Sequence, residues 1–286
     1  MPPPSPDALG SLPRPAAGVK AALLTLFAVW LAFAVAINWG GASPDLFVLF
    51  CGSNALILKG EVWRLVTGPL LHHPGQLGHI LFALLGVYFL SPSLEQSWGA
   101  RRYLRFVALS AVAAYAFQLL VWMILPASIA GRLVPEYWYG AMPVIEAIAI
   151  AWALSFRGQT VRLMMLIPVT SRTLVLFVVG VSVLAVVALS HTPSGLIAPF
   201  GGMLAGWLLG GGRTSPLRRW WLRQKLVQTE RALQVERDRR QRRIARSPFR
   251  VIEGGNQPSD DRESGPPSSD PGAPGEGRGP DGRLLN

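Results

Sequence analysis

The sequence predicts an all-α, multi-pass membrane protein with six transmembrane helices and a cytoplasmic C-terminal helix. Half of the 286 residues are hydrophobic and only 15% are charged, whereas soluble domains carry roughly 25% charged residues. Residues 21–50 contain a single charged residue, Asp45, and residues 173–212 contain none. Apolar runs of 18 or more residues are long enough to cross a hydrocarbon core of about 30 Å as helices. The chain is therefore expected to be an integral membrane protein.

Composition divides the chain into four segments. Residues 1–17 are rich in proline, which indicates a disordered leader without a recognisable signal peptide. Residues 18–212 contain the apolar runs and are expected to form the membrane domain. Residues 213–246 are strongly basic and free of proline after Pro216, which favours a helix. Residues 247–286 are dominated by Pro, Gly, Ser and Asp and are expected to be a disordered tail.

The six expected spans cover residues 19–37, 77–93, 103–126, 140–156, 172–190 and 194–212. An additional apolar stretch, residues 46–58, is short and interrupted, so it indicates an interfacial or half-inserted segment. Arg and Lys are enriched before the first span, after the second, fourth and sixth, and are few in the alternate connections. This bias places both termini in the cytoplasm. Richness in Ala, Arg and Gly is typical of a high-GC bacterium, so the bacterial inner membrane is the expected location.

The positive charge is concentrated after the last span. Residues 213–250 hold thirteen Lys or Arg and three acidic residues, which accounts for +10 of the net charge of +11. One interpretation is a solvated tail that fixes the topology. The other is binding to anionic lipid, where each basic residue near the surface contributes roughly 1 kcal/mol and Trp220 and Trp221 settle at the interface. Nucleic acid is an unlikely partner, because no stacking pattern or recognition motif accompanies the charge.

Three motifs occur in order along the chain. Glu61-Val62-Trp63-Arg64 is followed by Leu71-His72 and His79, then by Leu94-Glu95-x-x-x-Gly99-x-x-Arg102, and finally by Ala198-Pro199-x-x-Gly202-x-x-x-Gly206. This series resembles the rhomboid family of intramembrane serine proteases. The resemblance implies a compact six-helix bundle with a lateral gate and a cavity that opens to the extracytoplasmic side. Its structural positions are Trp63, Arg64, Glu95, Gly99, Arg102, Gly202 and Gly206.

The catalytic positions implied by the resemblance are mostly replaced. Met142 stands where the family has the serine of Gly-x-Ser, and Pro199 stands where it has the histidine base. Neither a thioether nor a proline supplies a nucleophile or a base. In the oxyanion motif His-x-x-x-Asn, His79 is retained and Ala83 replaces the amide donor, a loss that alone costs about 10²–10³ in rate. The expectation is a pseudoprotease, a proteolytically inactive member of the family.

Glu146 is the ionisable residue that the sequence places well inside a span, and such a group is a functional candidate by default. It follows Met142 by one helical turn and shares its face, which we expect to lie within reach of His79 and Tyr88. One interpretation is a hydrogen-bonded core acid. The other is a polar spot that recognises a polar or helix-breaking residue of a client, with His79, Met142 and Glu146 as the client-binding candidates.

Other polar residues offer weaker alternatives. Ser190, His191 and Ser194 could form a displaced dyad, although polar residues at helix ends are usually caps. The set His72, His73, His79 and Glu61 matches no zinc-site spacing, so neither a metal nor a cofactor is expected. Cys51, the single cysteine, is expected to be a core residue.

Gly202, Gly206 and Gly210 recur every four residues and predict a smooth helical ridge that packs closely on a neighbouring helix. The expected partners are Gly140, Ala147 and Ala151 of the fourth span. Such packing would preserve the helical bundle although the reactive side chains of the family are replaced.

The resemblance implies a function for an inactive member: binding transmembrane client proteins and influencing their stability or trafficking. Two alternatives remain open. One is an active rhomboid-type serine endopeptidase with a displaced dyad. The other is a membrane scaffold that recruits a soluble partner through its basic tail.

Overall fold

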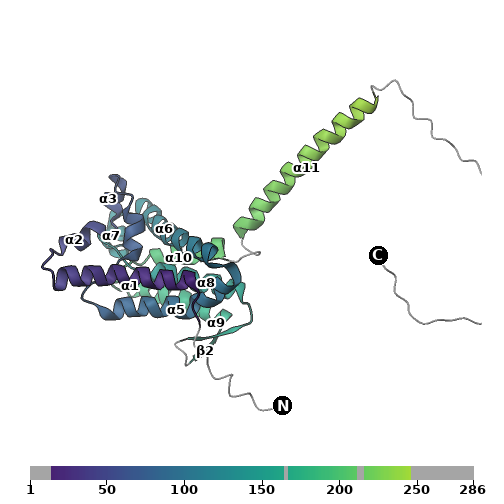
Figure 1. The fold of residues 1–286 in the computed structure, drawn as a ribbon. Helices are drawn as coiled ribbons and strands as arrows, with labels where there is room; N and C mark the ends of the chain where they lie inside the picture. Colours follow the sequence, from purple (N-terminus) through teal and green to yellow (C-terminus); the bar gives the residue numbers. More distant parts are fainter. Residues whose placement is uncertain (1–13, 164–166, 211–215, 246–286) are drawn as a thin grey trace, which may run out of the picture. The chain divides into compact units, whose positions relative to one another are not determined.

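The computed structural model describes residues 14–163, 167–210 and 216–245, which are helical apart from short connections and one β-hairpin (Figure 1). Three helices are long and apolar enough to cross a membrane: α1 (Ala17–Asn38), α5 (Leu77–Trp98) and α6 (Ala100–Ile124). Three shorter apolar helices are α8 (Met142–Ser155), α9 (Ser171–Val187) and α10 (Ala198–Ala205), which continues into a π-helical turn, η3 (Gly206–Gly210). Each of the six expected spans thus overlaps with one of these helices.

Helix α8 is the centre of the bundle. Its residues from Pro143 to Ala153 are all buried, as expected for a helix that is apolar on every side. It packs against α5, α6, α9 and the continuous α10–η3 helix. Its fourteen residues span about 21 Å, so α8 is shorter than α5, α6 and α9.

The glycine ridge of α10 and η3 lies against α8. A Cβ atom added to Gly202, Gly206 or Gly210 would overlap with α8, so only glycine fits this crossing. The facing residues are, in order, Pro143, Ala147 and Ala151. Two of the three expected partners are therefore correct, and Pro143 takes the place expected for Gly140.

Helices α5 and α6 are separated by Gly99 alone, which has a φ of +82°. The expected spans, residues 77–93 and 103–126, left a longer gap here. Pro92 lies inside α5, and Glu95 is buried. Glu95 has hydrogen-bond partners within the bundle, the N–H groups of Gly18 and Val19. The helix therefore continues beyond its apolar run.

Glu95 caps the N-terminus of α1. Its two carboxyl oxygens accept hydrogen bonds from the backbone N–H groups of Gly18 (2.5 Å) and Val19 (2.9 Å). The residue before α1, Ala16, provides no side-chain cap of its own. On the same end of the bundle, the guanidinium of Arg102 lies 5.0 Å from the ring centroid of Trp98.

The segment between α1 and α5 forms short helices, which confirms that residues 46–58 are not a continuous span. They are α2 (Asp45–Phe50), α3 (Asn54–Leu58), α4 (Arg64–Thr67) and the 3₁₀ turn η2 (Gly68–Leu70). Helices α2 and α3 lie at the same end of the bundle as α7 (Ala127–Leu133) (Figure 1). Helix α7 was not expected from the sequence.

Trp138 anchors these short helices to the bundle. Its ring stacks on Tyr115 of α6 at a centroid distance of 4.0 Å, and its Nε1 donates to Asn54 Oδ1 at 3.0 Å. A Cβ atom on Gly52 or Gly68 would overlap with this ring. Glycine at both positions therefore allows the chain to wrap closely around the indole.

Arg64 ties α4 to α2. The side chain is 3% exposed and donates to the carbonyl groups of Val48 (3.0 Å) and Cys51 (2.5 Å), and to the carboxylate of Glu61 (2.6 Å). Its neighbour Trp63 is 49% exposed. Within the Trp-Arg pair, the arginine is thus the residue that holds the loop together.

A two-stranded antiparallel hairpin joins α8 to α9, with β1 (Thr160–Leu163) paired to β2 (Ile167–Thr170). The sequence predicts only a basic connection here, because the strands are four residues long and lack a periodic signal. The last described helix, α11 (Pro216–Ala245), agrees with the helix expected within residues 213–246. The tail over residues 247–286 and most of the leader over residues 1–17 lie outside the described residues.

Candidate functional site

The three residues at the catalytic positions of the sequence pattern lie at the beginnings of three helices. His79 lies in the first turn of α5, Met142 is the first residue of α8, and Pro199 is the second residue of α10. Helix α8 also has a proline, Pro143, at its second position. The first N–H groups of a helix have no intrahelical partner, so proline is accommodated there. Pro199 therefore stands in place of the histidine of the pattern and is compatible with the start of α10.

His79 belongs to a cluster of rings and a tight glycine contact. Its ring centroid is 4.8 Å from that of His72 and 5.8 Å from that of Tyr139. Gly140 has a φ of +113°, and a Cβ atom there would lie 3.2 Å from the imidazole of His79. The carbonyl of Gly140 accepts a hydrogen bond of 2.7 Å from the hydroxyl of Tyr115. The retained His79 is thus fixed by packing beside the loop that precedes α8.

The two imidazoles have unpaired nitrogens. His72 is buried, its Nδ1 lies 3.3 Å from the carbonyl of Leu70, and its Nε2 has no hydrogen-bond partner within the described part of the chain. The Nδ1 of His79 is buried without a partner as well. Burial, together with the adjacent His79, lowers the pKa of His72 to about 4, against a smaller opposing effect of the Leu70 carbonyl. His72 is consequently neutral near pH 7.

Cys51 has the environment of a core residue. It is 1% exposed, and burial raises the pKa of its thiol to about 12 although Arg64 acts in the opposite direction. Thiol nucleophiles react as thiolates. Cys51 is therefore protonated and unreactive at neutral pH.

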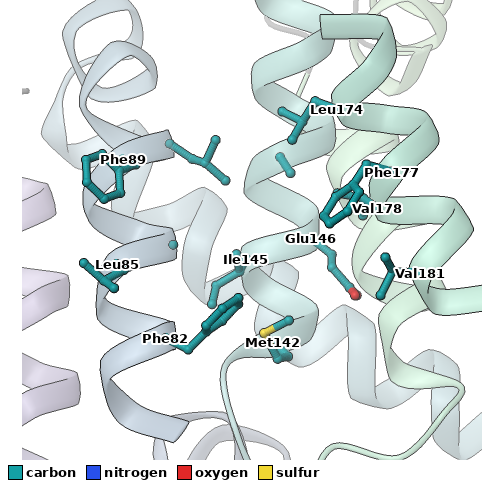
Figure 2. Close-up of a pocket in the computed structure, with 13 residues that line it drawn as sticks. Phe82, Leu85, Phe89, Met142, Ile145, Glu146, Leu174, Phe177, Val178 and Val181 are labelled. Atoms are coloured by element: carbon teal, nitrogen blue, oxygen red, sulfur yellow. The ribbon is translucent and has the colours of Figure 1, made fainter. Parts of the chain in front are cut away.

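An apolar pocket of about 170 Å³ lies between α5, α8 and α9 (Figure 2). Helix α5 contributes Phe82, Leu85, Gly86, Phe89 and Leu90; α8 contributes Met142, Ile145, Glu146 and Ala149; α9 contributes Leu174, Phe177, Val178 and Val181. Met142 and Glu146 are thus brought together, as their spacing predicted. His79 does not line this pocket, so the three expected client-binding candidates divide between two places.

Glu146 is the one ionisable side chain in the lining of this pocket. It is 8% exposed, and its Oε1 lies 3.2 Å from the hydroxyl of Ser182 in α9. Its Oε2 is buried and has no partner among the described residues. Figure 2 shows the Glu146 side chain reaching toward Val181 of α9. Ser182 was not among the residues predicted for the site; its hydroxyl within an otherwise apolar span was the available signal.

The expected alternative dyad is not assembled in the described part of the chain. Ser190, His191 and Thr192 line a separate pocket of about 430 Å³ with Arg132 of α7. Among the described residues, no hydrogen bond joins a serine hydroxyl to His191, and Ser194 donates instead to the carbonyl of Gly195 at 3.4 Å. The described residues also contain no group of three His, Cys, Asp or Glu side chains that could hold a metal ion.

The apolar helices, the buried central helix and the pocket define an integral membrane protein of the helical-bundle type. The family model described as the Rhomboid domain matches residues 59–214, which is more than half of the chain. The chain belongs to the rhomboid family.

A curated relative supports the same family. The chain is 34% identical over 73 residues to the rhomboid protease GluP of Bacillus subtilis (strain 168). This match covers 25% of the present chain and 14% of the relative. The similarity is therefore confined to a small part of that protein.

Proposed function

We propose that this rhomboid-family protein is proteolytically inactive and binds transmembrane segments of client proteins, thereby influencing their stability or trafficking. The observation that carries the proposal is the apolar pocket between α5, α8 and α9, which begins at Met142, where the family pattern has its serine. A pocket of this size and lining receives apolar side chains of a segment in the bilayer and needs no reactive group.

The chemistry of the site supports inactivity. Peptide-bond hydrolysis by a serine or cysteine enzyme needs a nucleophile and a base within hydrogen-bond reach of each other. Within the described residues, no serine or cysteine donates a hydrogen bond to an imidazole, and Met142 and Pro199 supply neither role. The remaining imidazole of the pattern, His79, lies next to Gly140 rather than a hydroxyl.

The proposed topology has six spans with both termini in the cytoplasm. Helices α1, α5 and α6 have the required length, and α8, α9 and α10–η3 are shorter apolar helices. In this topology α5, α8 and α10 all begin on the extracytoplasmic side. The shared position of His79, Met142 and Pro199 at the starts of these three helices supports it, as does the distribution of Arg and Lys. The proposed location is a bacterial inner membrane.

Photo-crosslinking of the full chain in nanodiscs tests the binding function. A photoreactive amino acid at Phe177, which lines the pocket, is compared with the same amino acid at Leu120, an exposed position on α6. Single-pass transmembrane peptides are expected to crosslink at Phe177 and not at Leu120. Equal crosslinking at the two positions would show that the peptides contact the bundle without selecting the pocket.

A second proposal concerns α11, whose described side chains are mostly exposed. This helix contains ten Lys or Arg and three acidic residues, and both Trp220 and Trp221 are about half exposed. Such a helix suits the anionic surface of a cytoplasmic leaflet. Recruitment of a soluble partner is the alternative. Deleting residues 218–286 separates these roles from client binding, because a scaffold loses its partner whereas the membrane bundle keeps its clients.

A further inference from the structure

We infer that Glu146 selects the bound segment by accepting a hydrogen bond from a polar side chain within a client's transmembrane helix. This inference rests on the proposed function and specifies its ligand: a helix that is apolar except for a donor such as Asn, Gln or Lys at the depth of Glu146. The pocket would thereby distinguish such helices from uniformly apolar ones.

The hydrogen bonds within the protein leave Glu146 incompletely satisfied. The hydroxyl of Ser182 lies 3.2 Å from Glu146 Oε1 and 3.0 Å from the carbonyl of Val178. A hydroxyl has a single hydrogen, so the two acceptors compete for it. Oε2 has no partner among the described residues. An unpaired polar atom in an apolar interior is unfavourable, and a ligand that brings a donor removes this penalty.

The pocket also opens toward the lateral surface of the bundle. Phe82 of α5 is 50% exposed, and Phe177 and Val181 of α9 are 55% and 50% exposed. All three line the pocket that contains Glu146. Apolar residues that are half exposed on membrane helices face the bilayer, so the ligand is expected to arrive from the lipid rather than from water.

Access to Oε2 requires a small rearrangement, and Met142 provides it. The atom is buried, and Met142, one helical turn before Glu146, lines the same pocket (Figure 2). Methionine has three rotatable bonds and adapts readily to a new neighbour. A cavity of about 170 Å³ next to it gives the displaced thioether and the incoming side chain room.

The test measures binding of host helices to the full chain in nanodiscs by energy transfer. The hosts are Leu/Ala-rich transmembrane peptides that differ only at one central residue, which is Leu, Asn or Lys. The native protein is expected to bind the Asn and Lys hosts roughly 3- to 20-fold more tightly than the Leu host, as interhelical hydrogen bonds in membranes allow. Glu146→Leu should abolish the preference for both polar hosts.

Glu146→Gln is the matched variant that preserves shape. It keeps an acceptor oxygen, so the preference for the Asn host should remain, whereas the preference for the Lys host should fall because the carboxyl group is gone. Equal binding of all three hosts to the native protein, or an unchanged Lys preference in Glu146→Gln, would overturn the inference. Equal binding of the hosts at the pocket still agrees with the proposed function, whereas absence of binding by every host overturns both.

Discussion

The carboxyl group of Glu95 accepts a hydrogen bond of 2.5 Å from the backbone N–H of Gly18, which lies 77 positions earlier in the chain. This contact joins the N-terminus of α1 to the junction between α5 and α6. The N-terminus of a helix has unpaired N–H groups and a partial positive charge. A carboxylate supplied by another helix satisfies both and fixes where α1 begins.

Replacing Glu95 with alanine is expected to destabilise the bundle. The two N–H groups of Gly18 and Val19 would lose their acceptor, and loss of a cap costs about 0.5–2 kcal/mol. The free energy of unfolding is measured in mixed detergent micelles for Glu95→Ala and for Gln96→Ala, an exposed neighbour in the same helix. Equal stability of the two variants would contradict the capping role.

Adding a methyl group to the glycine ridge is expected to separate α10–η3 from α8. A Cβ atom on Gly206 would overlap with the backbone of Ala147, and overpacking of this kind costs about 1–3 kcal/mol. Gly180 of α9 is the matched control, because an added Cβ there meets no atom within 4 Å. Thermal unfolding in detergent should show a lower melting temperature for Gly206→Ala and little change in melting temperature for Gly180→Ala. A similar effect of both changes would contradict the close crossing.

Acidification is expected to weaken the fold through His72. Its pKa is about 4 in the folded protein and about 6.5 in an unfolded chain, so the unfolded state binds more protons between these values. Stability is therefore full above about pH 6.5 and declines as the pH falls toward 4, by at most about 1.4 kcal/mol per pH unit for this group. His72→Gln should reduce the difference in melting temperature between pH 7.5 and pH 5, whereas changing the exposed His191 to Gln should not. If His72→Gln left the difference in melting temperature between the two pH values unchanged, His72 would not be the group that destabilises the fold in acid.

Helix α11 is expected to bind anionic membranes. In proteoliposomes with brominated acyl chains, the fluorescence of Trp220 and Trp221 is obtained as the difference between the native protein and Trp220→Phe/Trp221→Phe. Quenching of these two residues should be stronger with anionic than with zwitterionic lipid, and added salt should reduce it because exposed charges are screened. Equal quenching in both lipids would favour the solvated-tail interpretation.

The sequence was informative about features that repeat along one helix. Apolar runs located the three described helices that are long enough to cross a membrane and the three shorter apolar ones, and the spacing of Gly202, Gly206 and Gly210 predicted the tight crossing with Ala147 and Ala151. These patterns depend on composition and period, which do not require knowledge of the neighbouring helix.

Features that depend on how helices face one another were missed. Ser182 is one hydroxyl in an apolar span, and its pairing with Glu146 depends on the rotation of α9 about its axis. The separation of His79 from the Glu146 pocket likewise follows from the packing of its imidazole against Gly140. The α5–α6 junction was placed wrongly because Glu95 was not known to be buried beneath α1.

The most direct test of proteolytic inactivity is a cleavage assay in proteoliposomes with a panel of rhomboid-type transmembrane substrates. The purified native protein and the variant Met142→Ser/Pro199→His are measured side by side. We predict that the native protein gives no product above that of empty liposomes, because Met142 and Pro199 occupy the positions of the nucleophile and the base. Product formed by the native protein, and retained through further purification, would contradict the proposal and would require a second catalytic site.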